Sequence, residues 1–591
     1  MENFDFQTVG DLALRWSPSG EKFSWLCREG SLFFLARWQN AESLYGLIGL
    51  NHPGIEDQRE EVRQISAEVI AAIEDPHRGL ALEEALRDMP GWGLVVQTMR
   101  GLRAYRDPIG RLPLMWRRVV DGEQGKGAGV VVGTRPAMVM GSARRIRRHR
   151  LELFLRGQHG RERDDFFQGV QRIRAGEVLL AERTGRLWSR SYWTPSPLPL
   201  TEEVETAAQH IGDALATAIE GSASRAGELI SLSGGYDSTL LLLLFRELGK
   251  QPRSLSMVAK GTSHVDERST IEGLLAAQQI EGEFFDIRGP QQWGTPQVHH
   301  PTVDFGPAFM AEAAYFRNFY AHARTLLERQ RKPAVLVTGL GSDQLFYVTP
   351  FEWAQDQIWK GRPLPAVGSW RWRLKSRLKG RAKKWGLSRF PYPCRSRPAP
   401  PWMTAQKRRR DLQWRVLYDR HRWLKQRAEF FQSWYWEYTM RLLERYRRST
   451  GLFVELPFLH LDVLRVGLSL PPSVLRARGE IKAPLRRLLD SRVPASFFDN
   501  RRIGCFDEVV WEGFRYYLRP SPQELIGAHR LSEYLCIDRQ EIQDRLAANF
   551  DEPNIFHRQY AFELWHVMAT ELWLRQWDAA GQSVIREPLP I

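Results

Sequence analysis

Cysteine is scarce in this chain of 591 residues. Only four are present (Cys27, Cys394, Cys505 and Cys536), and they lie far apart with no CxxC pair. This spacing argues against a disulfide framework and against a structural zinc site built on paired cysteines. It is typical of proteins in a reducing compartment, so we expect a cytoplasmic location.

Long apolar runs are also missing. The most conspicuous one, Leu240 to Phe245, is far too short to cross a bilayer, so we expect no membrane partner. No basic segment followed by an apolar one comes after Met1, and we expect no signal peptide. With 43% hydrophobic and 26% charged residues, the chain reads as globular, and its length predicts two or more domains.

Negative charge is outnumbered, since 84 lysines and arginines against 69 aspartates and glutamates leave a net charge of +15. Such an excess suits a polyanion, an acidic partner or a genome that favours arginine, and charge alone does not choose among them. Tryptophan is abundant, with 22 residues, many of them among arginines in the C-terminal half. Aromatic and arginine side chains together could bind a peptide.

The stretch from Leu229 to Phe245 carries the clearest chemistry. It reads as a short buried strand, then S-G-G-Y-D-S, then an apolar helix. Glycines in a strand-to-helix turn let backbone N–H groups approach a phosphate, and the helix N-terminus favours negative charge. Asp237 in this turn could hold a divalent metal against the phosphates. No lysine follows the glycines, so this is not the GxxxxGK[ST] loop.

The S-G-G-Y-D-S turn resembles the pyrophosphate loop of N-type ATP pyrophosphatases, in their asparagine synthetase branch. Gly339 to Phe346 resembles the GxGSDxLF loop of the same family, in which Asp343 would be the second carboxylate for Mg²⁺ beside Asp237. The resemblance implies contacts with ATP by Leu232, Ser233, Gly234, Gly235, Asp237, Ser238, Met257, Gly341, Ser342 and Asp343. Strands alternate with helices here, which predicts a doubly wound parallel sheet in an ATP-binding domain over residues 202–591.

The C-terminal third carries two more family signatures. Leu456 to His460 resembles a motif ending in PFLD, with His460 in place of the aspartate, and Ser469 to Pro472 reads SLPP as the family does. Lys482 lies in a segment that resembles the family's KxxLR, so the resemblance makes it the catalytic cation. We expect His460 to be a packing or capping residue rather than a base.

Residues 1–193 show short β-like runs and one helix. Within them, Tyr105 to Leu114 resembles the RDPxGxxPL signature of the glutamine amidotransferase domain in asparagine synthetases, which implies an Ntn-type αββα domain. Such domains use an N-terminal cysteine as nucleophile. Residue 2 is Glu2, and Cys27 cannot take that role without processing, so we expect a degenerate domain with a structural role.

Two segments separate or interrupt these domains. Residues 194–201 alternate with proline and read as a linker. Residues 359–410 are dense in arginine, lysine, tryptophan and proline, with four basic residues from Lys407 to Arg410. This insertion is interpreted either as a solvated surface segment or as an electropositive clamp for an acidic peptide or partner.

The family resemblance implies that a carboxylate is adenylated by ATP with Mg²⁺ and then attacked by an amine. With no glutaminase expected, the amine is already on the substrate, which fits two branches: β-lactam synthetase-like enzymes and lasso peptide cyclases. Leu340 stands where the family has Glu or Tyr, which speaks against the β-lactam branch and leaves the general base unnamed. We therefore favour a lasso peptide cyclase that acts on a precursor core peptide, with a leader peptidase and a leader-recognition protein as partners.

Two other interpretations stay open. A nucleic-acid-modifying ATP pyrophosphatase could use the basic insertion on RNA, although no cysteine lies in a motif of the kind such enzymes often use. A catalytically inactive scaffold is disfavoured because Asp237, Asp343 and Lys482 are all present.

Overall fold

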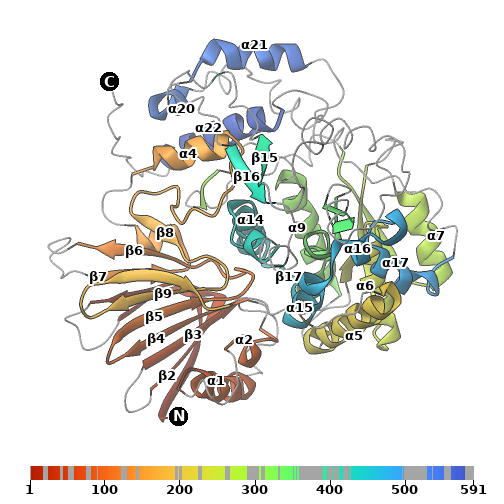
Figure 1. The fold of residues 1–591 in the computed structure, drawn as a ribbon, viewed down its shortest axis with the longest axis horizontal. Coiled ribbons are helices and arrows are strands. Elements are labelled where there is room, and N and C mark those ends of the chain that lie inside the picture. The colour runs from red at the N-terminus through yellow and green to blue at the C-terminus, as the bar shows by residue number, and fades with distance from the viewer. Residues whose placement is uncertain are drawn as a thin grey trace.

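The computed structural model shows a chain with a large antiparallel sheet at its N-terminal end, a parallel α/β unit, and a helical layer formed by the C-terminal residues (Figure 1). The structure describes residues 2–17, 24–39, 44–50, 59–74, 82–89, 91–120, 129–140, 145–193, 198, 203–223, 229–259, 267–288, 305–307, 313–330, 333–349, 352–353, 356–357, 391–395, 402, 412–416, 424, 427–494, 497, 529–535, 537–550 and 561–579.

The N-terminal sheet has ten strands in the order β10-β9-β5-β4-β3-β2-β1-β7-β6-β8, and every neighbouring pair is antiparallel. The strands are β1 (Glu2–Trp16), β2 (Ser24–Gln39), β3 (Leu44–Leu50), β4 (Trp92–Thr98), β5 (Gly101–Arg106), β6 (Met115–Val119), β7 (Gly129–Gly133), β8 (Val170–Arg172), β9 (Glu177–Glu182) and β10 (Leu187–Ser191). An αββα domain has two stacked sheets, whereas the ten described strands are hydrogen-bonded in a single order. The expected αββα layering therefore stays a prediction.

Both faces of this sheet are covered by apolar groups. On β4, Leu94 and Val96 pack in one cluster with helices α1 (Arg59–Glu74) and α2 (Leu82–Ala85). Val95 points to the other face, where its cluster includes Val335 and Phe453 of the parallel unit. The two-residue period of a strand thus joins one face to local helices and the other to the next domain.

The second sheet is parallel throughout, in the order β13-β12-β11-β14-β17. Its strands are β11 (Leu229–Ser231), β12 (Arg253–Val258), β13 (Gly282–Asp286), β14 (Val335–Val337) and β17 (Phe453–Glu455). From β11 the chain adds β12 and β13 on one side of the sheet and then β14 and β17 on the other side. The boundary between β11 and β14 is therefore a topological switch point, where ligands usually bind in such sheets. The predicted α/β class with a parallel sheet is confirmed.

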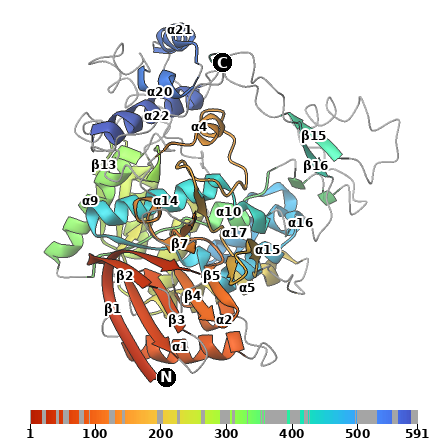
Figure 2. The same ribbon diagram turned by 90° about the vertical axis from the view of Figure 1, so that its left-hand side faces the viewer.

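Helices pack around this sheet and above both domains (Figures 1 and 2). They are α5 (Val204–Ala223), α6 (Tyr236–Glu247), α7 (Arg268–Gln278), α9 (Ala313–Arg329), α10 (Ser342–Phe346), α14 (Trp434–Thr450), α15 (Leu461–Ser469), α16 (Pro472–Leu475), α17 (Ala483–Asp490), α20 (His529–Tyr534), α21 (Arg539–Phe550) and α22 (Ala561–Ala579). Short helices α3 (Pro136–Val139) and α4 (Arg148–Leu155) belong to the N-terminal part.

Helix α14 joins the two domains through a buried ionic cluster. Glu437 accepts from Arg106 at 2.9 Å and from Arg441 at 3.0 Å, and Arg172 lies 3.4 Å away. Arg106 begins the RDPxG signature, so that signature contributes directly to domain docking. Although burial opposes ionisation, the Arg106, Arg441 and Arg172 guanidinium groups hold the pKa of Glu437 far below its ordinary value.

The expectation that tryptophans of the C-terminal half bind a peptide is wrong for several of them. A group of these side chains is buried in the core, namely Trp402, Trp434, Trp436, Trp565, Trp573 and Trp577. Trp402 is the one tryptophan of residues 359–410 that the structure describes, and it packs in the same apolar cluster as α22. Indole rings carry large apolar area, and here that area stabilises the fold.

Other expectations fall largely outside the described residues. Of the linker, only residue 198 is described, and of the insertion only 391–395 and 402. Strand β15 (Pro391–Arg395) pairs with β16 (Leu412–Val416) in an antiparallel ribbon. Lys407 to Arg410 lie outside the described residues. Among the described helices, none combines the length and the apolar character that a membrane span requires.

Candidate active site

The first loop of the site follows β11 and leads into α6. Gly234 has a φ of 67°, a conformation that a residue with a side chain rarely adopts, and Gly235 is the N-cap of α6. The Ser233 backbone N–H donates to Ser238 Oγ at 3.1 Å, and the Gly235 N–H donates to Ser233 Oγ at 3.3 Å. Asp237 lies in the first turn of α6, so the strand–turn–helix predicted from the sequence is confirmed.

The second loop follows β14 and touches the first. Gly341 has a φ of 104°, and a Cβ there would lie 2.5 Å from Leu459 Cδ2. A Cβ on Gly339 would lie 3.1 Å from Asp237 Cβ. Only glycine therefore fits at Gly341, and the close approach at Gly339 sets the two loops side by side. Asp343 lies in the first turn of α10, directly after this loop.

Lys482 brings the two loops together. Its Nζ is 2.5 Å from Asp237 Oδ2 and 2.7 Å from Asp343 Oδ1, and it donates to Ser342 Oγ at 3.4 Å. The Lys482 side chain is 7% exposed, whereas that of Asp343 is 70% exposed, so the cluster opens to solvent on the α10 side. The structure thus joins the three residues that the sequence motifs singled out.

Burial and charge act against each other in this cluster. Burial raises the pKa of Asp237 above its usual value, and Lys482 only partly offsets this. Burial alone would lower the pKa of Lys482, but Asp237 and Asp343 together raise it. Lys482 is therefore a stable cation at neutral pH.

The donor set fits Mg²⁺ with phosphate ligands. Asp237 Oδ1 is buried and has no hydrogen-bond partner among the described residues, so this oxygen is available to coordinate a metal ion. Mg²⁺ is commonly held by one or two carboxylates together with substrate phosphates and water. No cluster of three or more His, Cys, Asp or Glu suited to a metal occurs in the described part of the chain, so the two aspartates would need the nucleotide's oxygens.

The residues expected near adenine lie on adjacent strands. The Leu232 N–H donates to the Leu255 carbonyl at 3.1 Å, and the Leu232 side chain is buried. Met257 is half-buried near the carboxyl end of β12. Their contact with adenine stays a prediction. Leu340 is half-buried, and its backbone N–H donates to Thr338 Oγ1 at 3.2 Å.

A second group of ionisable side chains, which the sequence did not predict, lines a cavity of about 60 Å³ between the two domains. Glu455 and His460 line it from the parallel unit, and Asp88 and Asp107 from the N-terminal domain. His460 Nδ1 accepts from the Asp462 backbone N–H at 3.4 Å, which confirms the capping role, while its Nε2 lies 3.2 Å from Asp88 Oδ1. No sequence signal links His460 with Asp88, because they come from different domains.

Comparison with known proteins points to one family. The model of the asparagine synthase family matches residues 210–575. No curated protein matches this chain. Among solved structures, a glutamine phosphoribosylpyrophosphate amidotransferase from B. subtilis, complexed with ADP and GMP, covers 56% of this chain and 76% of its own length. An allosteric regulatory enzyme of purine biosynthesis covers 50% of this chain and 77% of its own. Both are 11% identical with TM-scores of 0.19, and likenesses at that level carry no argument.

Proposed function

This chain belongs to the asparagine synthase family of ATP-dependent amide-forming ligases, and on that premise we propose that it is a lasso peptide cyclase. It adenylates an Asp or Glu side chain of a precursor core peptide, with release of pyrophosphate. The N-terminal amine of the same peptide then attacks the acyl-adenylate, releases AMP and closes a macrolactam. The observation that carries the ligase chemistry is the convergence of Asp237, Asp343 and Lys482 at the switch point of the parallel sheet.

Each residue of the site has a separate task. Asp237 and Asp343 would hold Mg²⁺, which offsets the phosphate charge and polarises the α-phosphate when bound. The N-terminus of α6, with its partial positive charge, would bind the pyrophosphate oxygens. Lys482 stabilises the negative charge that develops at the α-phosphate and in the tetrahedral intermediate.

Three sequence features favour, as the substrate, a peptide that itself carries the attacking amine. Glu2 stands where the related amidotransferase domains have their nucleophile, and Leu340 stands where the β-lactam branch has a tyrosine. The basic insertion of residues 359–410 offers charge for an acidic peptide. Orienting the folded peptide tail would supply an effective molarity of roughly 10⁵–10⁸ M. The proposed partners are a leader peptidase and a leader-recognition protein, in the cytoplasm.

The test combines the purified chain with a candidate precursor peptide, Mg·ATP and the leader peptidase. A cyclase yields a peptide lighter by one water, together with AMP and pyrophosphate. A peptide in which the acceptor Asp or Glu is replaced by its amide should stay linear. A β-lactam synthetase-like ligase would act on a small amino acid instead, and AMP formation stimulated by RNA would favour a nucleic-acid-modifying enzyme.

A further inference from the structure

The ammonium group of Lys482 lies between the two aspartates that would hold a divalent cation. It contacts one oxygen of each aspartate, at 2.5 Å for Asp237 and 2.7 Å for Asp343. Mg²⁺ binds carboxylate oxygens at roughly 2.0–2.1 Å, so even an ion held through the unbonded Asp237 Oδ1 would lie close to the ammonium. Two cations so close would also repel each other strongly in a site that is largely buried.

The segment that carries Lys482 has an unfavourable backbone conformation. Among described residues with a side chain, a positive φ occurs at Gln279, Arg478 and Lys482, with φ of 53° at Arg478 and 51° at Lys482. Between them, Gly479 also has a positive φ, of 84°. Such conformations persist only where surrounding contacts impose them.

Contacts at both ends of the segment impose this conformation. The Lys482 side chain is fixed by the two aspartates. Two residues earlier, Glu480 pairs with Arg487 at 3.1 Å and Arg486 at 3.5 Å, both on helix α17. Release of the Lys482 ammonium would remove one of the two anchors that hold the strained turn.

We propose that Lys482 is an internal cation that closes the metal site of the nucleotide-free protein, and that Mg²⁺ enters only together with a nucleotide. The inference rests on the nucleotide and metal site of the proposed function. Free Mg²⁺ must either displace the Lys482 ammonium from the aspartates or bind beside it against its repulsion. A nucleotide offers that ammonium its phosphate oxygens, so metal and nucleotide bind cooperatively. The lysine is then transferred from the aspartates to the phosphates, where its catalytic charge is needed.

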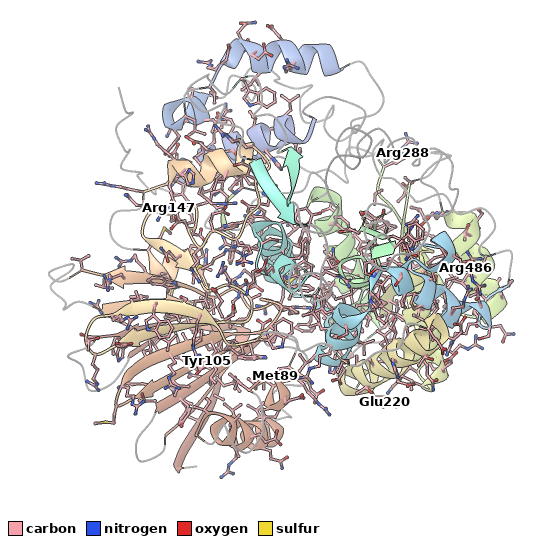
Figure 3. The ribbon with its side chains drawn as sticks, viewed as in Figure 1. Met89, Tyr105, Arg147, Glu220, Arg288 and Arg486 are labelled. Carbon is pink, nitrogen blue, oxygen red and sulfur yellow. The ribbon has the colours of Figure 1, made fainter. Side chains whose placement is uncertain are left out.

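The test measures binding of Mn²⁺ alone to the full chain, by electron paramagnetic resonance, for the parent and for Lys482→Met. We expect the variant to bind the free ion at least about tenfold more tightly, because the competing cation is gone. Arg486→Gln is the matched control: it removes one positive charge from α17, where Figure 3 labels this residue, from a side chain that pairs with Glu480 and Asp490. Glu480 keeps its pair with Arg487 in this variant, so the second anchor of the turn stays in place. It should change Mn²⁺ affinity by less than about threefold.

A second measurement adds a non-hydrolysable ATP analogue. In the parent, the analogue should tighten Mn²⁺ binding markedly, and in Lys482→Met this tightening should be smaller, because only the contribution of the phosphate oxygens as metal ligands remains. If the parent shows analogue-dependent binding but the variant binds free Mn²⁺ no more tightly than the parent, the inference is wrong and the nucleotide site stands. If Mn²⁺ binds to neither protein even with the analogue, the metal site and the proposed function fail together. Lys482→Gln, read by the same assay, replaces the methionine variant if that variant does not fold.

Discussion

Glu437 should be the residue on which docking of the two domains depends most. Its side chain is 4% exposed, and it faces Arg106 at 2.9 Å, Arg441 at 3.0 Å and Arg172 at 3.4 Å. Glu437→Gln keeps the volume and removes the charge. Arg441 retains Asp165, but Arg106 and Arg172 have no other carboxylate within 4 Å among the described residues. Breaking a buried ion pair in this way costs about 3–5 kcal/mol.

The assay is urea unfolding of parent and variant, followed by fluorescence. A matched control is Glu328→Gln, which breaks an exposed pair with Arg324 on α9 and should cost less than about 1 kcal/mol. The pH dependence gives a second readout. The pKa of Glu437 is depressed in the folded state, so its stabilisation is present above its ordinary pKa of about 4.3 and is lost as pH falls toward the folded value.

The stability difference between parent and Glu437→Gln should therefore be constant between about pH 6 and 8 and shrink below about pH 4. A variant within about 1 kcal/mol of the parent at pH 7 would show that the cluster is not an obligatory interface. A difference that grows on acidification would show that the sign of the pKa shift is wrong.

Three further predictions concern the chemistry. Asp237→Asn or Asp343→Asn should slow AMP formation by about 100-fold, which corresponds to about 3 kcal/mol in activation free energy. Circular dichroism should show that the fold of each variant is intact. Normal pyrophosphate release by either variant would show that the metal site lies elsewhere. Lys482→Ala should lower kcat by roughly 10²–10³-fold and change nucleotide affinity far less, because the variant loses contacts of the lysine in both the free and the nucleotide-bound protein. Lys482→Arg should recover little, because a planar guanidinium does not replace a compact ammonium. Near-parent turnover of the alanine variant would make Lys482 a structural residue. Glutamine should not be hydrolysed, and Cys27→Ala should keep full ligase activity; glutamate release by the purified chain would refute the degenerate-domain prediction.

The geometry of the two loops in the candidate site was predictable because their residues lie in local motifs. Ser233 to Ser238 and Gly339 to Asp343 each end a buried strand, and parallel strands bring their carboxyl ends to one edge. The position of Lys482 followed from the family resemblance alone, since its contact with Asp237 spans 245 residues of sequence. Nothing in the sequence indicated that the lysine would sit between the two aspartates.

Two features of the N-terminal half escaped prediction for physical reasons. Strand β1 was not foreseen, because register shifts between Glu2 and Asp5 and between Val9 and Asp11 break the alternation of apolar and polar residues. The Glu437 cluster joins residues 331 positions apart, and isolated arginines and glutamates ordinarily read as solvated surface. Likewise, the tryptophans of the C-terminal half suggested a binding surface because a count of residues says nothing about burial.

The central claim, that this chain forms an amide within a peptide through an acyl-adenylate, is tested most directly by one reaction. The purified chain, the precursor peptide freed of its leader and Mg·ATP are incubated together, and peptide mass and nucleotide products are measured in the same sample. We predict a peptide lighter by one water and one AMP for each ring closed. An unchanged peptide mass while AMP accumulates, or ring closure accompanied by ADP and phosphate, would contradict it.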